Sequence, residues 1–273
     1  MHYRHAFHAG NFADVFKHTL LCGLLLTLNR KDKPWCYLDT HAGAGKYDLG
    51  SAGAMRTAEW RDGIGRLEDC HETMEPVATY LRVVRQQPQG TYPGSPIFAL
   101  ALARAQDRLI LCEKVEEVAV DLRTALRGEA RTHIHRRDGY EAHALLPPQE
   151  KRGLVIIDPP FERVDEFDAV ADFLRQALGR FGAGIYAVWY PIKNRHAATR
   201  FVRRVARESQ KPVTEFRLET GAPGEGQMRA CGVLVVNPPF RFDEEVMPAL
   251  RGLVALLAQG SQAAVEVESF GPS

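Results

Sequence analysis

Short apolar runs alternate with longer amphipathic stretches along most of the chain, and this alternation predicts an α/β protein. Runs rich in β-branched residues, such as Leu154–Ile157, predict strands buried on both faces of a parallel sheet. The predicted strands cover residues 34–39, 107–113, 132–136, 153–157 and 184–190. The predicted helices between them cover residues 97–106, 115–127, 167–181 and 199–209. This order predicts one doubly wound, mainly parallel sheet with helices on both faces.

A polar segment precedes the first predicted helix. Asn11 is suited to cap that helix, and Asp14 would lie in its first turn, where the helix dipole favours a negative charge. The helix is expected to end near Leu28. The residues expected on its buried side are Val15, Leu20, Leu24 and Leu28. A polar segment that leads directly into a buried helix suggests that the segment has a function.

The alternation of strands and helices breaks between residues 51 and 93. Two stretches, 59–69 and 76–87, have helical patterns, and a turn-rich segment at 90–96 follows them. We therefore expect a small helical insertion at 51–93, within a single domain that covers residues 1–273.

Near the other end of the chain, two apolar stretches flank a glycine-rich loop. They cover residues 213–219 and 231–236, and the loop covers residues 221–226. This arrangement predicts an antiparallel pair of strands that ends the sheet.

Composition limits the classes of function. Of the 273 residues, 45% are apolar and 25% are charged, as in an ordinary soluble globular protein. The net charge of +1 gives no strong overall field for a polyanion, although a local basic face remains open. The five cysteines include no C-x-x-C pair, which favours reduced thiols in a cytoplasmic protein and disfavours a zinc ribbon. The apolar stretch Leu20–Leu28 is too short to span a bilayer, so we expect no membrane segment.

Acidic residues stand at the ends of four predicted strands. They are Asp39, Glu113, Asp138 and Asp158. Because the carboxyl ends of parallel strands meet at one edge of a sheet, these side chains should converge on one site, where open α/β sheets bind ligands. Glu113 is expected to accept hydrogen bonds from both ribose hydroxyls of a nucleoside cofactor.

A glycine turn, Gly43-Ala44-Gly45, follows the first of these acids. Glycines at this place let the backbone approach a ligand closely. The turn lacks the G-x-x-x-x-G-K-[ST] pattern of a P-loop, and Asp48 breaks the G-x-G-x-x-G pattern of a dinucleotide-binding turn. The D-x-x-x-G-x-G form fits S-adenosylmethionine better and weakens the alternative of a nicotinamide-dependent oxidoreductase.

The strand at 153–157 runs directly into Asp158-Pro159-Pro160-Phe161. The prolines cannot donate to a sheet, so the strand must stop there and leave a carboxylate, a carbonyl and an aromatic ring at its end. Such a set is typical of amino-group methyltransferases that act on nucleic-acid bases. The alternative interpretation is a strand that simply ends in a proline turn.

A second copy of this motif occurs at Asn237-Pro238-Pro239-Phe240. Order along the chain favours Asp158 as the functional copy, because it follows the other acids in one parallel run. The strand before Asn237 belongs to the predicted antiparallel pair, so Asn237 should lie away from the cofactor.

Four arginines form a stripe on the predicted helix at 199–209. They are Arg200, Arg203, Arg204 and Arg207, with the acid Glu208 nearby. This spacing places them on one face of a helix. The stripe is either a solvated face or a set of contacts to RNA phosphates.

Three histidines near the start of the chain, His2, His5 and His8, have a spacing that suggests a metal site. No cysteine or acid completes a ligand set beside them, so we expect no metal.

Further motifs, spread over essentially the whole chain, resemble those of one family. They are Tyr3-Arg4-His5, Phe7-His8-Ala9-Gly10-Asn11, Ala13-Asp14-Val15, Lys17-His18, 38–45, 92–96, Asp138-Gly139, 157–160 and Trp189-Tyr190-Pro191. On these motifs the chain resembles the bacterial ribosomal RNA large-subunit methyltransferase J family. Phe161 stands where that family usually has tyrosine, and either ring can stack on adenine.

The resemblance implies a Rossmann-like class I methyltransferase fold with S-adenosylmethionine as the cofactor. It implies methyl transfer to N6 of adenine 2030 in 23S rRNA, either naked or in an early precursor, with no obligate protein partner. The main alternative is a protein tied to the use of external DNA, either a DNA-binding module or a DNA adenine methyltransferase. A binding module would not need the acids at the strand ends.

The resemblance also implies roles for individual residues. The implied cofactor contacts are His18, His41, Gly43, Ser95, Glu113, Asp138, Gly139 and Asp158. The implied catalytic residues are Lys17, Asp158, Pro159 and Phe161. The expected substrate contacts are Tyr3, Arg4 and Phe161, together with Arg203, Arg204 and Arg207 from the stripe.

Overall fold

Eight strands form one sheet in the computed structural model, which describes residues 7–223 and 228–271. Their order is β10-β8-β9-β7-β6-β1-β4-β5. The strands are β1 (Cys36–Asp39), β4 (Arg108–Glu113), β5 (Thr132–Arg136), β6 (Gly153–Ile157), β7 (Ile185–Pro191), β8 (Val213–Glu219), β9 (Ala230–Val236) and β10 (Ala264–Phe270). The five predicted strands of the parallel run are all present.

The sheet has a parallel part and an antiparallel part. β5, β4, β1, β6 and β7 run parallel, and Leu38 of β1 pairs with Ile110 of β4 and Val155 of β6. β9 is antiparallel to both β7 and β8, which confirms the predicted antiparallel pair. The prediction missed β10, which pairs with β8, and the helix α8 (Phe242–Leu257) that precedes it.

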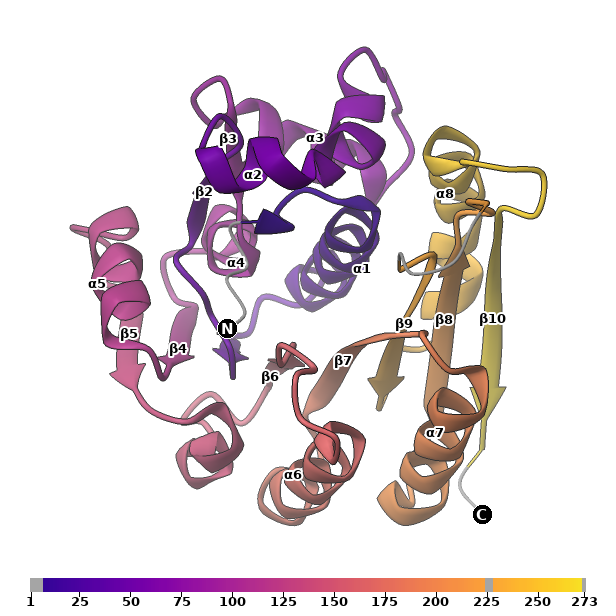
Figure 1. The fold of residues 1–273 in the computed structure, drawn as a ribbon. Coiled ribbons are helices and arrows are strands. Elements are labelled where there is room, and N and C mark those ends of the chain that lie inside the picture. Colours follow the sequence, from indigo (N-terminus) through magenta and orange to yellow (C-terminus); the bar gives the residue numbers. More distant parts are fainter. Residues whose placement is uncertain (1–6, 224–227, 272–273) are drawn as a thin grey trace.

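Helices cover both faces of the sheet (Figure 1). One face carries α1 (Phe12–Asn29), α3 (Val77–Arg85), α4 (Ser95–Leu102), α5 (Glu116–Ala125) and α8. The other carries η4 (Gly139–Leu145), α6 (Glu166–Arg180) and α7 (Arg195–Ser209). Alternate residues of each strand serve the two cores, so that Leu111 packs on the α1 side and Ile110 on the α6 side. No helix within the described ranges is long and apolar enough to cross a membrane.

Helix α1 runs through the interior of the protein. The Oδ1 of Asn11 accepts the backbone N–H groups of Ala13 and Asp14, each at 3.0 Å, which confirms the predicted N-cap. The residues predicted for its buried side, Val15, Leu20, Leu24 and Leu28, are all buried. A helix that is apolar almost all round belongs in a core. Lys17 and His18 are therefore carried into the interior by the same helix.

Residues 51–93 form α2 (Ala52–Thr57), the 3₁₀ turns η2 (Glu59–Asp62) and η3 (Ile64–Leu67), α3 and β3 (Thr91–Pro93). β3 pairs with β2 (Lys46–Asp48) in a separate small sheet that was not predicted. The single helix predicted at 59–69 is wrong. Gly63 interrupts it with a non-helical backbone (φ −115°, ψ −111°), and its lack of a Cβ allows close approach to Gly10, whose carbonyl oxygen would lie 2.0 Å from a Cβ. We propose that this stretch is an insertion within one domain that spans the chain.

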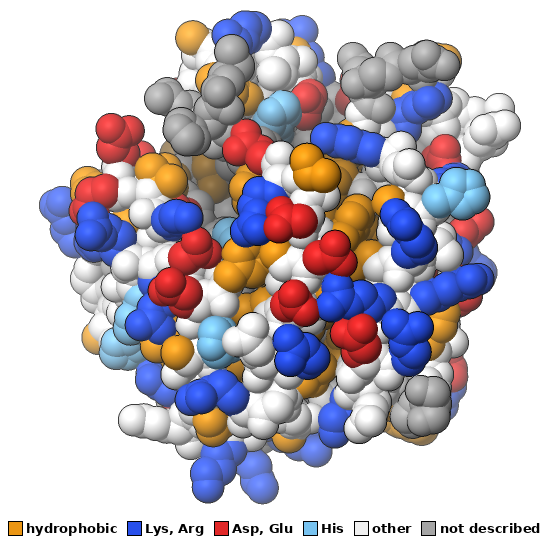
Figure 2. Space-filling view, turned by 60° about the horizontal axis from the view of Figure 1, so that its bottom comes forward, with side chains coloured by type: hydrophobic (Ala, Val, Ile, Leu, Met, Phe, Trp, Pro, Cys, Tyr) orange, Lys and Arg blue, Asp and Glu red, His pale blue; other side chains and the backbone are white. Residues whose placement is uncertain are grey.

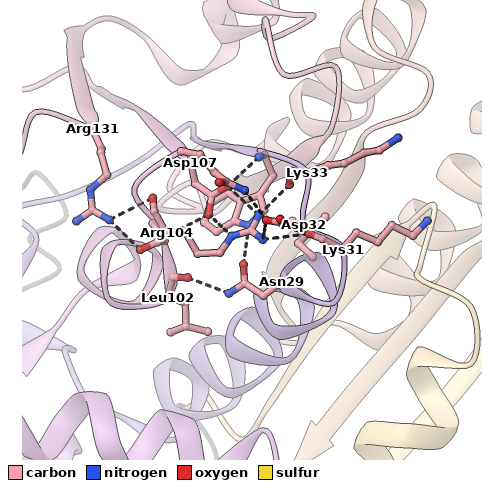
Figure 3. Close-up of polar contacts among 12 residues, drawn as sticks. Asn29, Lys31, Asp32, Lys33, Leu102, Arg104, Asp107 and Arg131 are labelled. Carbon is pink, nitrogen blue, oxygen red and sulfur yellow. Dashed lines mark hydrogen bonds and ion pairs between the residues drawn. The ribbon is translucent and has the colours of Figure 1, made fainter.

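An ion pair at the amino edge of the sheet ties two loops together, the one before β1 and the one before β4 (Figure 3). The buried carboxylate of Asp107 accepts the Nε of Arg104 at 2.9 Å and the backbone N–H of Trp35 at 3.0 Å. The guanidinium of Arg104 also donates to the carbonyl oxygens of Lys31, at 3.0 Å, and Lys33, at 2.8 Å. These bonds fix the start of β1 and the start of β4 relative to the end of α1.

We expect replacement of Asp107 by alanine to lower the free energy of unfolding by about 2–4 kcal/mol. The change leaves the Trp35 N–H without its buried acceptor and Arg104 without its closest carboxylate. The control is Asp32→Ala, because Asp32 lies 3.7 Å from the same guanidinium but its side chain is 96% exposed. Urea unfolding should show a loss for Asp107→Ala and no measurable change for the control. Equal stability of the two variants would contradict this role.

Candidate active site

Four acidic residues lie at the carboxyl ends of neighbouring strands, as predicted. Asp39 ends β1, Glu113 ends β4, Asp138 follows β5, and Asp158 follows β6. The strand order β6-β1-β4-β5 places these ends side by side. The acids do not play equal parts, because their burial and their partners differ.

Lys17 joins the buried helix α1 to the end of β6. Its Nζ donates to Asp158 Oδ2 at 2.5 Å and to Asp14 Oδ1 at 2.8 Å. The side chains of Lys17 and Asp14 are 5% and 4% exposed, whereas that of Asp158 is 18% exposed. Burial lowers the pKa of Lys17, but the two carboxylates outweigh burial and hold the pKa well above its ordinary value. Lys17 therefore stays positively charged, and Asp158 beside it is the most exposed of the three side chains.

The turn after β6 holds an aromatic ring beside Asp158. Pro159 is buried, and Phe161 has a φ of +48°, in the left-handed region that bulky residues rarely adopt. The Phe161 ring meets Phe167 edge-on at 5.2 Å and Trp189 at 5.9 Å between centroids. Strained backbone of this kind is concentrated at functional sites. Here it places the Phe161 ring against Phe167 and Trp189, three residues after Asp158.

The glycine turn after β1 is tied to Glu113. The backbone N–H of Gly43 donates to Glu113 Oε2 at 3.1 Å, and that of Val115 donates to Oε1 at 2.8 Å. Gly43 and Gly45 have φ values of +64° and +78°, which favour glycine. Burial raises the pKa of Glu113, although the backbone hydrogen bonds oppose the rise. The carboxylate keeps acceptor capacity for a ligand beyond these bonds.

Asp39 is a buried carboxylate that supports the glycine turn after β1. It is completely buried and accepts hydrogen bonds from Ser95 Oγ at 2.6 Å, from the Tyr37 hydroxyl at 2.8 Å and from the backbone N–H of His41 at 3.1 Å. Burial raises the pKa of Asp39 to about 6, because these three hydrogen bonds only partly oppose it. The hydroxyl of Ser95 is thus turned toward Asp39, so any contact that Ser95 makes to a cofactor uses its remaining lone pairs or its backbone.

The turn after β5 packs directly on the turn after β1. A Cβ on Gly139 would lie 2.2 Å from the carbonyl oxygen of Thr40 and 2.7 Å from the His41 ring. The His41 ring stands edge-on to Tyr140, with 5.4 Å between centroids. Burial lowers the pKa of His41 to about 4, so this imidazole is neutral at neutral pH. Only glycine allows this approach, which explains the Asp138-Gly139 pair in the sequence.

Asp138 combines a structural and an electrostatic role. Its Oδ1 accepts the backbone N–H of Tyr140 at 3.1 Å and so caps η4. Its Oδ2 forms an ion pair with Lys114 at 2.8 Å. Burial raises the pKa of Asp138, but Lys114 and the Tyr140 N–H together lower it below its ordinary value. The carboxylate therefore remains ionised at the rim of the site.

His18 lies deeper than the other predicted cofactor contacts. Its Nδ1 is 2.9 Å from the Tyr92 hydroxyl, and its ring stacks on Phe98 with 4.7 Å between centroids. The side chain is 1% exposed. These contacts give His18 a packing role between α1 and α4, and its contact with a cofactor stays a prediction.

The structure does not bring the arginine stripe into this site. Arg204 is held by three carboxylates: Asp168 at 2.7 Å, Asp172 at 2.8 Å and Glu208 at 3.1 Å. Its charge is compensated, so it joins α7 to α6, a role that the stripe did not suggest. Arg200, Arg203 and Arg207 are exposed on α7.

Asn237 lies at the opposite edge of the sheet, as predicted from the antiparallel strand. Its Nδ2 donates to the carbonyl oxygens of Gly182, at 3.0 Å, and Gly184, at 2.8 Å, just before β7 begins. Its φ is +55°. The second proline motif therefore has a structural explanation that needs no ligand.

Two predicted substrate contacts, Tyr3 and Arg4, lie outside the described residues, as do His2 and His5 of the suggested metal site. Within the described ranges, no group of three or more His, Cys, Asp or Glu side chains is arranged to hold a metal. The predictions for these residues stay predictions.

The residue-level predictions omitted two side chains of the site. Asp14 was assigned only to the helix dipole, although its spacing of three residues from Lys17 signals an ion pair on a helix. Trp189 lies on β7 with its ring 5.9 Å from Lys17 Nζ. Its signals in the sequence were its place near the end of a strand and the motif Trp189-Tyr190-Pro191, to which no role was assigned.

A cavity of about 240 Å³ opens elsewhere, between α7 and the strands β8 to β10. Its charged lining residues are paired with one another, as Arg217 is with Glu215 at 3.1 Å and with Glu266 at 3.0 Å. None of the four acids Asp39, Glu113, Asp138 and Asp158 lines it. The converging acids are therefore the better candidate for the chemistry.

Known proteins are similar to this chain in sequence and in fold. Residues 32–268 match the family described as "Ribosomal RNA large subunit methyltransferase D, RlmJ". The chain is 37% identical to Ribosomal RNA large subunit methyltransferase J of Escherichia coli (strain K12) over 250 residues, 89% of each chain. It is 34% identical to the protein of the same name from Haemophilus influenzae over 277 residues, 99% of each. A crystal structure from Legionella pneumophila has a TM-score of 0.89 at 35% identity and covers 96% of this chain and 98% of that one.

The raised pKa of Asp39 predicts a pH-dependent contribution to stability. Between its ordinary value of 3.8 and its folded value of about 6, the folded protein binds more protons at Asp39 than the unfolded chain does. Stability from this group therefore falls as pH rises through that window. The free energy of unfolding of the native protein minus that of Asp39→Asn should fall by about 2–3 kcal/mol between pH 4 and pH 6. Denaturant unfolding at several pH values measures this difference, and a constant difference would contradict the assignment.

Proposed function

The chain belongs to the ribosomal RNA large-subunit methyltransferase J family, and from that premise we propose that it transfers a methyl group from S-adenosylmethionine to N6 of an adenine in 23S rRNA. The observation that carries the proposal is Asp158, partly exposed just after the end of β6, with Pro159 and Phe161 following it in the same turn. The family makes the chain an rRNA methyltransferase. This geometry supports an exocyclic amine, N6 of an adenine, as the atom that is methylated.

The acids and the glycine turn suit a nucleoside cofactor with a cationic sulfonium. Glu113 offers acceptor positions for two ribose hydroxyls, and the backbone at Gly43 permits close approach. We assign His18, His41, Ser95, Asp138 and Gly139 to the same binding site, on the family resemblance. When bound, S-adenosylmethionine supplies an activated methyl group.

Asp158 and Pro159 can orient the target amine. The exocyclic amine of adenine is a weak nucleophile, because its lone pair is delocalised into the ring. Asp158 Oδ2 is occupied by Lys17, which leaves Oδ1 to accept one N6–H, and the Pro159 carbonyl can accept the other. Two such bonds favour a pyramidal nitrogen and aim its lone pair at the methyl group. After transfer, Asp158 or solvent takes the proton that the nitrogen loses.

Phe161 offers a face for the target base. A base must leave its stack before an enzyme can act on its amine, and an aromatic side chain compensates for the lost stacking. We assign Tyr3 and Arg4 to the substrate on the family resemblance alone. The same resemblance points to adenine 2030, in naked 23S rRNA or an early precursor, with no obligate protein partner. An rRNA substrate would place the enzyme in the cytoplasm.

The duplicate proline motif provides a matched test of the site. We expect Asp158→Ala to lower kcat by about 10²- to 10⁴-fold, because the amine loses an acceptor in the transition state. Asn237→Ala should keep most of the activity and lose about 1–2 kcal/mol of stability with its two hydrogen bonds. Both are measured with labelled S-adenosylmethionine and 23S rRNA, beside a melting curve for each variant. Loss of activity in the folded Asn237 variant alone would overturn the assignment.

The exposed face of α7 suits the RNA backbone. Lys193, Arg200 and Arg203 form no ion pair within the described residues, and Arg207 has only Glu208, at 3.8 Å. Lys193 lies two residues after the end of β7, so this basic face begins at the edge that carries Asp158. Figure 2, in which the α6–α7 face comes forward, shows Lys and Arg side chains gathered over α7 on the right. We propose that these residues contact phosphates that flank the target.

Replacement of Arg200, Arg203 and Arg207 by glutamine should raise the KM for RNA and leave cofactor affinity unchanged. Each lost phosphate contact should reduce the slope of log K against log salt by about 0.7–0.9, so the triple variant should lose about 2–3. Arg204→Gln is the control on the same helix, and should lower stability but keep the slope. Filter binding at several salt concentrations measures the slope for the triple variant and for the control. An unchanged slope in the triple variant would show that the face is only solvated.

A further inference from the structure

Trp189 lies in register with the reacting group. β6 and β7 are parallel, and Ile157 pairs with Val188, so the next residues along the two strands are Asp158 and Trp189. Ile157 and Val188 both face the α6 side of the sheet. Because side chains alternate along a strand, Asp158 and Trp189 both point to the α1 side, where Lys17 lies.

The indole ring touches the two elements that shape the site. Lys17 Nζ lies 5.9 Å from the ring centroid, within the range of a cation–π contact. The Phe161 ring stands nearly perpendicular to the indole, at 78°, with 5.9 Å between centroids. The indole N–H lies near the buried thiol of Cys231, but it makes no hydrogen bond of ordinary geometry within the described residues. The ring therefore contributes its face and edge to the site.

Lys17 depends on its neighbours for its orientation. A lysine ammonium is a compact charge on a flexible stem and does not fix its own direction, unlike a guanidinium. Asp14 and Asp158 take two of its three N–H donors, and the indole face lies within reach of the ammonium. The position of the Asp158 carboxylate in turn depends on Lys17, because Lys17 Nζ is its hydrogen-bond partner. A change at the indole would thus reach Asp158 through Lys17.

We propose that Trp189 is a positioning residue for methyl transfer: its indole face holds Lys17, and Lys17 holds Asp158 at the angle that the target amine requires. This inference rests on the proposed function. It gives Trp189 no contact of its own with the reacting atoms, so loss of the ring should lower kcat and leave the binding of RNA and cofactor almost unchanged.

The first test compares Trp189→Leu, which removes the ring, with Trp189→Phe, which keeps an aromatic face but lacks the N–H. The control is Trp60→Leu. Trp60 also has a buried indole N–H that finds no partner in the described part of the chain, and Arg61 lies 5.6 Å from its ring, but it belongs to η2. We expect kcat to fall at least tenfold in Trp189→Leu, with each KM within about threefold of the native value. Trp189→Phe and Trp60→Leu should stay within about threefold in kcat.

A second test asks whether Trp189 acts through Lys17. In single-turnover experiments, Trp189→Leu should slow the native enzyme but add little to the defect of Lys17→Gln, because the residue that it positions is already gone. The proposal is wrong if Trp189→Leu slows methyl transfer by the same factor in the native enzyme and in Lys17→Gln. It is also wrong if Trp189→Leu keeps the native kcat or changes only a KM. If Lys17→Gln transfers no methyl group, the first comparison decides. Failure of the native protein to methylate RNA would instead refute the proposed function.

Discussion

A buried lysine with two carboxylates is the constraint around which this protein is arranged. Lys17 sits on a helix that is apolar almost all round, and a charge in such surroundings is tolerated only when it is paired and hydrogen-bonded. Asp14 supplies one partner from the same helix. The other partner, Asp158, comes from the end of a strand far along the chain. The pair therefore fixes α1 against β6 and places at the edge of the sheet a carboxylate that the described residues hold on one oxygen only.

The other features of the site follow from that edge. The parallel run β6-β1-β4-β5 brings four strand ends together, so each acid reaches the same region from a different strand. The turns after β1 and β5 touch directly, because Gly139 has no Cβ to keep its backbone away from the carbonyl oxygen of Thr40. The 51–93 stretch holds the start of α1 in place through the Ile64 N–H bond to the Gly10 carbonyl at 2.8 Å and the contact of His8 with Glu59 at 2.8 Å. The hydrophobic cores on the two faces of the sheet give these strand ends rigid support.

Sequence reasoning recovered the features that depend on local chemistry. Proline stops a strand wherever it occurs, so the end of β6 and the place of Asp158 could be read from four residues. Asn11 and Asp14 marked the start of α1 for similar reasons. The prediction failed where distant contacts decide. Gly63, which lies in close contact with Gly10, interrupts the helix expected at 59–69. The charge of Arg204 is compensated by three acids, two of which come from α6, so the stripe alone could not reveal its role. Trp189 could be tied to Lys17 only through strand register.

The most direct test of the account is the identity of the methylated nucleoside. Native protein would be incubated with isotopically labelled S-adenosylmethionine and either 23S rRNA or duplex DNA, and the digested nucleosides would be separated and identified by mass spectrometry. The account predicts label in N6-methyladenosine from the rRNA, with one modified position per molecule. Label on a cytosine, on a ribose or in the DNA alone would contradict it, and so would the absence of any labelled nucleoside.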